Sequence, residues 1–414
     1  MPLRYPVGRP GVRQRLQERY GAVHNKSELA AFIRHYSGVF AIFGVFGAYL
    51  STFFSTRGIS TAQIGLLMAI GPMTSLIVQP IWGILADKSR DKTRILRIIP
   101  IGSAGTILLY FVPSDFLGFA AVTFLFMVFN TAITPISDAY TVNYLTQNGQ
   151  KFSTVRLCGS FAYTVAAFVS GLFLNNGNLW IIFPFSALVF VAVFFNADTL
   201  PKMQLDRSHE HKPFLEVIRN KKLILILVFV FFMQLSMFFN ASFLGVYIKE
   251  LGFSDHIRGI IFGLVAFSEI PVLLVIDRAI RRFPVFTILI FSGFVMIARA
   301  MIYAFLPTPG FIILSQCLSG LTFIPVTYSA ITYINDEMPV EYKTTGQSLL
   351  AFVQQGAGSI LGSVLGGQLS ARFGIGNTYG IFAGLLTITT TIFLVMEISR
   401  RRTLNRALNP ANDG

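Results

Sequence analysis

The sequence predicts an all-α polytopic membrane protein, with twelve transmembrane helices in two pseudo-symmetric six-helix bundles. Composition, the length of the apolar segments and the distribution of basic residues support this prediction. The chain has 414 residues, of which 53% are hydrophobic and 13% are charged. Soluble domains carry about 25% charged residues. The 42 phenylalanines would favour aggregation on a water-exposed surface but are ordinary against lipid.

Twelve segments are long and apolar enough to cross a bilayer, which requires about 20 mostly apolar residues. They are predicted over 32–56, 60–86, 95–113, 116–145, 153–174, 179–197, 223–249, 255–280, 284–306, 309–336, 343–371 and 375–399. This pattern divides the chain into a tail over 1–31, an N-terminal bundle over 32–197, a charged linker over 198–222, a C-terminal bundle over 223–399 and a tail over 400–414.

Basic residues gather on one side of this topology. The loops of that side and both tails hold 26 of the 33 lysines and arginines, whereas the opposite loops hold four, namely Arg57, Lys249, Arg258 and Arg372. Positive residues mark the cytoplasmic side, so both termini are expected there, in a bacterial-type inner membrane. The net charge of +14 therefore indicates topology and contact with anionic lipid heads, and no nucleic-acid partner is expected.

The two halves resemble each other. The segment Gly58–Gly65 before the second span is similar to Gly252–Gly259 before the eighth, and Pro135 in the fourth span corresponds to Pro325 in the tenth. Parallel repeats of this kind place a substrate site near the bilayer midplane, between halves that rock to give alternating access.

A charged turn separates the second and third spans. Gly83 is expected to permit close helix approach, and Asp87 is expected to face the positive N-terminus of a neighbouring helix. The candidate residues of this turn are Gly83, Asp87, Lys88, Arg90, Lys92 and Arg94.

Four ionisable residues lie inside predicted spans: Asp138, Arg156, Glu269 and Arg299. Because an unpaired charge in hydrocarbon is costly, Asp138 is expected to pair with Arg156, and Glu269 with Arg299. Each pair is either a structural salt bridge or a functional one. In the functional interpretation Arg156 binds substrate oxygens through its planar fork. Burial disfavours charged Glu269, so this residue can take up and release a proton, and Arg299 resets it.

Other polar side chains could line the same cavity or hold helices together: Asn130, Gln234, Asn240, Gln316, Tyr328 and Gln354. Tyr163 could stack on a substrate ring or serve packing. The glycine-rich stretch 356–367 is expected to pack helices closely. The five histidines lack metal-ligand spacing and no phosphate-binding loop is present, so neither a metal nor a cofactor is expected.

The turn after the second span resembles the Gly-x-Leu-Ala-Asp-Arg/Lys-x-Gly-Arg-Lys loop of major facilitator transporters. The chain resembles this superfamily over essentially its whole length, and within it the branch of lactose permease, nucleoside symporters and phenylpropionate permease. The residues that carry this resemblance are Pro135-Ile-Ser-Asp138-Ala, Val155-Arg156-Leu-Cys-Gly159-Ser160, Glu269-Ile-Pro271, Arg299 and Gly320-Leu-Thr-Phe.

The resemblance implies that Asp138 and Arg156 bind sugar, that Tyr163 matches a sugar-stacking aromatic, and that Glu269 and Arg299 act in proton coupling. The tenth span departs from lactose permease, because it reads Ser319-Gly-Leu-Thr322 where that permease has a coupling His and Glu. Glu269 or Asp138 would then carry the proton alone.

We therefore expect a monomeric transporter, not an enzyme, that couples protons to symport of a small polar organic solute. A sugar, oligosaccharide or nucleoside is favoured over an aromatic acid. One alternative is a proton-coupled antiporter that exports amphipathic drugs or lipids. Another is a membrane receptor or enzyme that transports nothing.

Overall fold

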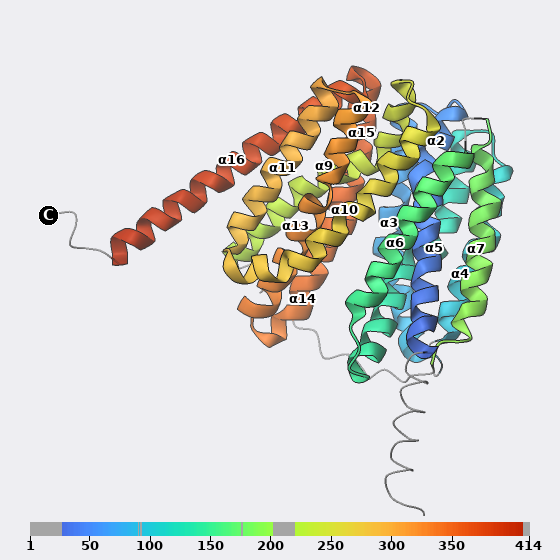
Figure 1. The fold of residues 1–414 in the computed structure, drawn as a ribbon, viewed down its shortest axis with the longest axis horizontal. Helices are drawn as coiled ribbons and strands as arrows, with labels where there is room; N and C mark the ends of the chain where they lie inside the picture. Colours follow the sequence, from blue (N-terminus) through green and yellow to red (C-terminus); the bar gives the residue numbers. More distant parts are fainter. Residues whose placement is uncertain (1–26, 90, 92, 175–176, 202–219, 409–414) are drawn as a thin grey trace, which may run out of the picture.

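The computed structural model describes residues 27–89, 91, 93–174, 177–201 and 220–408, and the regular structure within these ranges is helical (Figure 1). It confirms the twelve predicted spans. The N-terminal half contains a first span over Ser27–Thr56 that includes η1 (Phe43–Gly47) and α2 (Ala48–Thr56), followed by α3 (Thr61–Lys88), α4 (Thr93–Ile107), η2 (Leu108–Phe111), α5 (Phe116–Gln147), α6 (Phe152–Phe173), η3 (Leu179–Ile181) and α7 (Ile182–Ala197).

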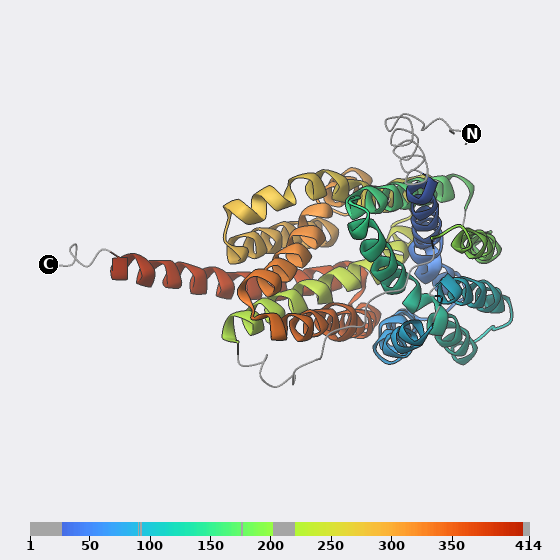
Figure 2. The same cartoon turned by 90° about the horizontal axis from the view of Figure 1, so that it is seen from below.

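The C-terminal half contains α9 (Lys221–Glu250), α10 (Asp255–Arg282), α11 (Val285–Phe305), α12 (Pro309–Cys317), α13 (Gly320–Glu337), α14 (Val340–Ala351), η4 (Phe352–Ala357), α15 (Gly358–Phe373) and α16 (Ile375–Leu408). Seen from below, the helices of the two halves form two groups side by side (Figure 2). Residues 1–26 of the predicted N-terminal tail and most of the predicted linker lie outside the described residues, whereas 27–31 belong to the first span. At the other end, α16 continues beyond 399 to Leu408, into the predicted tail.

The internal repeat is visible in the turns that begin α3 and α10. Gly58 and Gly252 both have positive φ, at 77° and 73°, a conformation that glycine adopts without steric cost. Two residues later, Ser60 and Ser254 accept hydrogen bonds from the backbone N–H groups of the first helical turn. Such capping satisfies donors that have no partner within the helix. The same local sequence thus starts an equivalent helix in each half.

Glycine pairs bring the two halves together at one end of the molecule. A Cβ on Gly65 of α3 would lie 2.9 Å from the Cα of Gly367 on α15, and a Cβ on Gly259 of α10 would lie 2.7 Å from the Cα of Gly171 on α6. Gly362, from the glycine-rich stretch, packs in the same way on the backbone of α9. The predicted packing role of this stretch is confirmed.

The hydrophobic core shows that this end is closed. One cluster of buried side chains includes Phe53 and Phe119 of the N-terminal half together with Phe239 and Tyr247 of the C-terminal half. Toward the other end the buried clusters separate, and each contains residues of one half only. In Figure 1 the ribbons of the halves accordingly lie closer at the upper end, near α2 and α12, than at the lower end.

The turn between α3 and α4 lies at the separated end. Asp91 stabilises it, because its carboxylate accepts hydrogen bonds from the backbone N–H and the hydroxyl of Thr93. A Cβ built on Gly83 would meet no neighbouring helix within 4 Å, so the close helix approach expected there is not present in this conformation. Lys88 and Arg94 are exposed, whereas Arg90, Lys92 and the side chain of Asp87 lie outside the described residues.

Candidate functional site

A central cavity of about 370 Å³ lies between the two halves, within the range of about 300–1,000 Å³ that is typical of small-molecule sites. Its walls come from the first span, α6, α9, α10, α11 and the start of α13. Aromatic side chains form much of the lining: Phe43, Tyr163, Phe238, Phe262 and Phe323. Polar side chains complete it: Gln234, Asn240, Glu269, Arg299 and Ser319. This combination of apolar walls and a few polar groups is typical of ligand sites.

Two irregular helical segments shape this cavity. The π-helical turn η1 carries Phe43 and Gly47 to its wall, and π-turns inside α-helices are frequent at functional sites. The tenth span breaks between α12 and α13, and Ser319 lines the cavity at this break. The N–H of Gly320 donates a 2.9 Å hydrogen bond to the Ser268 hydroxyl, beside Glu269. This contact fixes α10 against the break.

Glu269 lines the cavity and has no polar partner among the described residues. It is partly buried, and it forms no hydrogen bond or ion pair with any residue that the structure describes. The predicted salt bridge between Glu269 and Arg299 is therefore absent, although both residues line the same cavity. An ionisable group in this setting is available to a proton or a ligand.

Arg299 is held by neutral groups instead. It is 2% exposed. Its Nε donates to the Ser315 carbonyl at 3.0 Å, Nη1 to the Thr322 hydroxyl at 3.0 Å, and Nη2 to Gln316 Oε1 at 3.2 Å. These acceptors surround the break between α12 and α13, so groups of the protein itself accept hydrogen bonds from the guanidinium N–H donors of Arg299. Gln316 consequently positions Arg299 and does not line the cavity.

Asp138 on α5 accepts a hydrogen bond from the hydroxyl of Tyr36 in the first span. The predicted ion pair between Asp138 and Arg156 does not form in the described structure. The charges of Asp138 and Arg156 still interact electrostatically. The two charged residues are thus near enough to interact without forming an ion pair.

Arg156 on α6 lies over the ring of Phe40, with its Cζ 4.5 Å from the ring centroid. Phe40 in turn stacks on Tyr36 at a centroid distance of 6.0 Å. A cation over an aromatic face is stabilised by the ring quadrupole, while the guanidinium N–H groups remain available. The Arg156 charge also interacts electrostatically with Glu269 and Tyr328 of the opposite half. Arg156 therefore connects the two halves electrostatically.

The other sequence candidates divide into those that line the cavity and those that do not, and Tyr328 belongs to the second group. Tyr163, Gln234 and Asn240 line the cavity. Asn130 is buried within α5 and Gln354 donates to the Thr327 hydroxyl at 3.0 Å, so these two lie in the helix packing.

Sequence reasoning missed Tyr36 and Phe40, which hold Asp138 and Arg156. The only feature of the sequence that could have indicated Tyr36 and Phe40 is that these two aromatic residues lie four apart at the start of the first span. It also placed Arg258 in a loop, whereas this residue is buried in α10 with its Nη1 2.7 Å from Asp255 Oδ1. The carboxylate three residues earlier in the same helix was the available signal, since residues three apart share a helix face.

Comparison with known proteins gives three findings. The model of the MFS_1 like family matches residues 33–381. Maltose permease of Geobacillus stearothermophilus is 26% identical over 388 residues, 93% of this chain and 98% of that protein. Xanthosine permease of Escherichia coli strain K12 is 23% identical over 391 residues, 84% of this chain and 91% of that protein.

Among solved structures, a mutant of the nucleoside transporter NupG has a similar fold. Its TM-score is 0.81 at 17% sequence identity, covering 89% of this chain and 99% of that one.

Proposed function

Since this chain belongs to the MFS_1 like family of the major facilitator superfamily, we propose that it is a proton-coupled symporter that moves a small polar organic solute by alternating access. The observation that carries this proposal is the carboxyl group of Glu269, which lines a cavity between the two halves and forms no ion pair with a described residue. A buried carboxyl group that forms no ion pair can hold a proton in one state and lose it in another.

A sugar or nucleoside is the preferred solute class. Relatives that match nearly the whole chain are named maltose permease and xanthosine permease. The cavity suits such molecules, because Tyr163 and Phe262 offer faces for a ring while Gln234 and Asn240 offer donors and acceptors for hydroxyl groups.

We propose that Arg156, which does not itself line the cavity in this conformation, binds the solute and responds to charge in the other half. Its guanidinium rests on Phe40 and interacts electrostatically with Asp138 and Glu269. A solute oxygen that accepts a hydrogen bond from Arg156 would alter the electrostatic interaction between Arg156 and Glu269. Solute binding and the protonation of Glu269 would thereby become linked. Arg299, held by neutral acceptors, supplies a fixed positive charge at the cavity wall.

The side of the membrane follows from the charge distribution. With basic loops on the cytoplasmic side, the closed end with the Gly171–Gly259 contact faces outward, and the separated end faces the cytoplasm. The described conformation would then be inward-facing, with the termini in the cytoplasm of a bacterial-type cell and one chain as the transporting unit.

The test is to reconstitute the purified protein in liposomes and record internal pH. Sugars, nucleosides, aromatic acids and amphipathic cations are added outside in turn, and protein-free liposomes serve as the control. Acidification on addition of one class is expected and identifies the solute class. Alkalinisation would instead establish antiport, which the aromatic lining of the cavity also suits. Solute uptake without any pH change would contradict proton coupling.

A further inference from the structure

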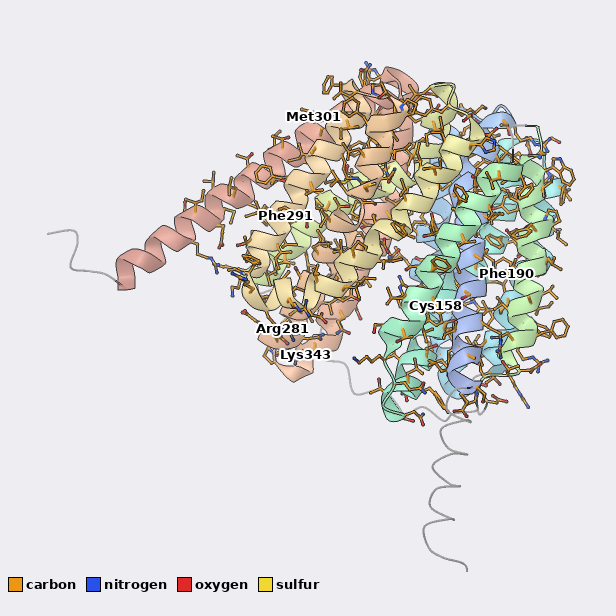
Figure 3. The ribbon with its side chains drawn as sticks, viewed as in Figure 1. Cys158, Phe190, Arg281, Phe291, Met301 and Lys343 are labelled. Atoms are coloured by element: carbon orange, nitrogen blue, oxygen red, sulfur yellow. The ribbon has the colours of Figure 1, made fainter. Side chains whose placement is uncertain are left out.

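An apolar groove of about 350 Å³ lies on the membrane-facing surface of the C-terminal half, apart from the central cavity. Helices α10 and α11 both pack on α13 but contact each other at few points, so a groove remains between them. Val272, Ile276 and Ile288 form its buried floor, and the half-exposed side chains of Val275, Phe283 and Phe291 border its opening. Figure 3 shows Phe291 on this flank, with Arg281 near its lower end.

The groove has the length of one acyl chain. The stripe of α10 from Val272 to Phe283 covers eleven residue steps, which correspond to about 16 Å of helix. One leaflet contributes about half of the 30 Å hydrocarbon core. The stripe ends at Phe283, where α10 ends, so a chain lying in the groove would begin at the membrane edge.

The positively charged side chain of Arg282 lies at that edge. Arg282 follows Val275 by seven residues and Ala279 by three, so it lies on nearly the same helix face as these two groove residues. Its Cζ is 5.9 Å from the ring centroid of Phe283. Arg282 is exposed and forms no ion pair with a residue that the structure describes. The only acid nearby on α10, Asp277, precedes Arg282 by five residues and lies on another face.

We propose that this groove binds one anionic phospholipid, with an acyl chain between α10 and α11 and its phosphate at Arg282. Apolar walls along one leaflet, open to lipid and ending at an unpaired arginine, complement a molecule with a long apolar chain and a negative head. A zwitterionic phospholipid has the same chains but lacks the net negative charge, so it gains less from Arg282. The site is independent of the solute cavity and of the proposed transport.

Native mass spectrometry of the full chain in detergent tests this proposal, with phosphatidylglycerol and phosphatidylcholine of identical acyl chains as probes. One saturable phosphatidylglycerol is expected, bound about fivefold more tightly than phosphatidylcholine, because one arginine near the surface contributes about 1 kcal/mol. Arg282→Gln should abolish this preference. Arg281→Gln is the matched control, since Arg281 aligns with Leu274 on the face away from the groove, and it should change the affinity less than about twofold.

A second pair of variants tests the chain-binding part. Val275→Trp fills the groove and should remove the saturable lipid, whereas Leu274→Trp places the same side chain on the same helix outside the groove and should retain it. Thermal unfolding of each variant establishes that it is folded. The proposal would be overturned if both lipids bind with equal affinity or if the two variants of either pair have equal effects. It would also be overturned if inorganic phosphate alone reaches the same occupancy.

Discussion

Gly171 of α6 and Gly259 of α10 meet backbone to backbone across the two halves. A Cβ on Gly171 would lie 2.5 Å from the Cα of Gly259, closer than non-bonded carbon atoms approach. The obstructing atoms belong to the main chain of a packed helix, so they cannot move aside as the end of a flexible side chain can. No side chain larger than hydrogen fits at either position while this end is closed.

Gly259→Trp is therefore expected to hold the halves apart at this end and to shift the population toward a state open on that side. We would place a single cysteine by Phe262→Cys at the cavity wall, in a Cys158→Ser/Cys317→Ser background, and measure its alkylation by an impermeant maleimide in intact cells. The rate should rise severalfold with Gly259→Trp. Gly384→Trp is the control, because no atom lies within 4 Å of a Cβ at Gly384; equal rates in the two variants would exclude a gate at Gly259.

Arg156→Lys should weaken solute binding, because lysine keeps the charge but loses the planar fork. Hydrogen bonds to a charged group contribute about 1.5–3 kcal/mol, so Kd should rise roughly 10- to 100-fold. Titration calorimetry with the solute identified in liposomes measures this change. Arg94→Lys, an exposed site outside the cavity, should leave Kd unchanged. A wild-type Kd in Arg156→Lys would assign Arg156 to helix packing through Phe40.

Thr322→Val tests whether neutral groups hold Arg299. The substitution preserves shape but removes the hydroxyl that accepts from Nη1 at 3.0 Å, leaving a buried charged donor without its partner. The expected cost is about 1–3 kcal/mol of folding free energy, which a lower Tm in detergent would reveal. Thr387→Val is the control, since the Thr387 hydroxyl donates only within its own helix, to the Ala383 carbonyl. Equal Tm values for both variants would contradict this role of Thr322.

The spans were predictable because each is set by local sequence. Apolar length determines where a helix crosses the bilayer, and caps such as Ser60 and Ser254 lie beside the helices that they begin. The equivalence of the halves was predictable for the same reason, because Gly58 and Gly252 each enforce the same turn within a few residues. In each case the residues that determine the feature are neighbours in the chain.

The partners of the buried charges were not predictable, because they depend on contacts between distant helices. Charge balance suggested that Arg299 pairs with Glu269, yet the break after Cys317 presents a backbone carbonyl and two side-chain oxygens to the arginine. The Ser319-Gly320 pair is a local signal for a break, but nothing in the local sequence shows that the groups around it accept from Arg299. Likewise, Tyr36 reaches Asp138 from a helix about one hundred residues away.

Two acids, Glu269 and Asp138, could carry the proton, and neutral substitutions distinguish them. Glu269→Gln preserves the size and polarity of a cavity residue but cannot ionise, so accumulation against a concentration gradient should be lost while solute exchange at equal concentrations continues. Liposomes with an imposed pH gradient measure the first activity, and counterflow of labelled solute measures the second. Glu337→Gln, on the exposed end of α13, is the control and should retain both.

If Asp138 carries the proton instead, the result inverts. Asp138→Asn would then abolish accumulation, and Glu269→Gln would accumulate solute at the wild-type rate. The structure favours Glu269, because Asp138 already accepts a hydrogen bond from Tyr36, whereas Glu269 has no partner among the described residues and lines the cavity. A carboxylate without such a donor gains more from binding a proton, and Glu269 alone of the two stands where the solute would lie.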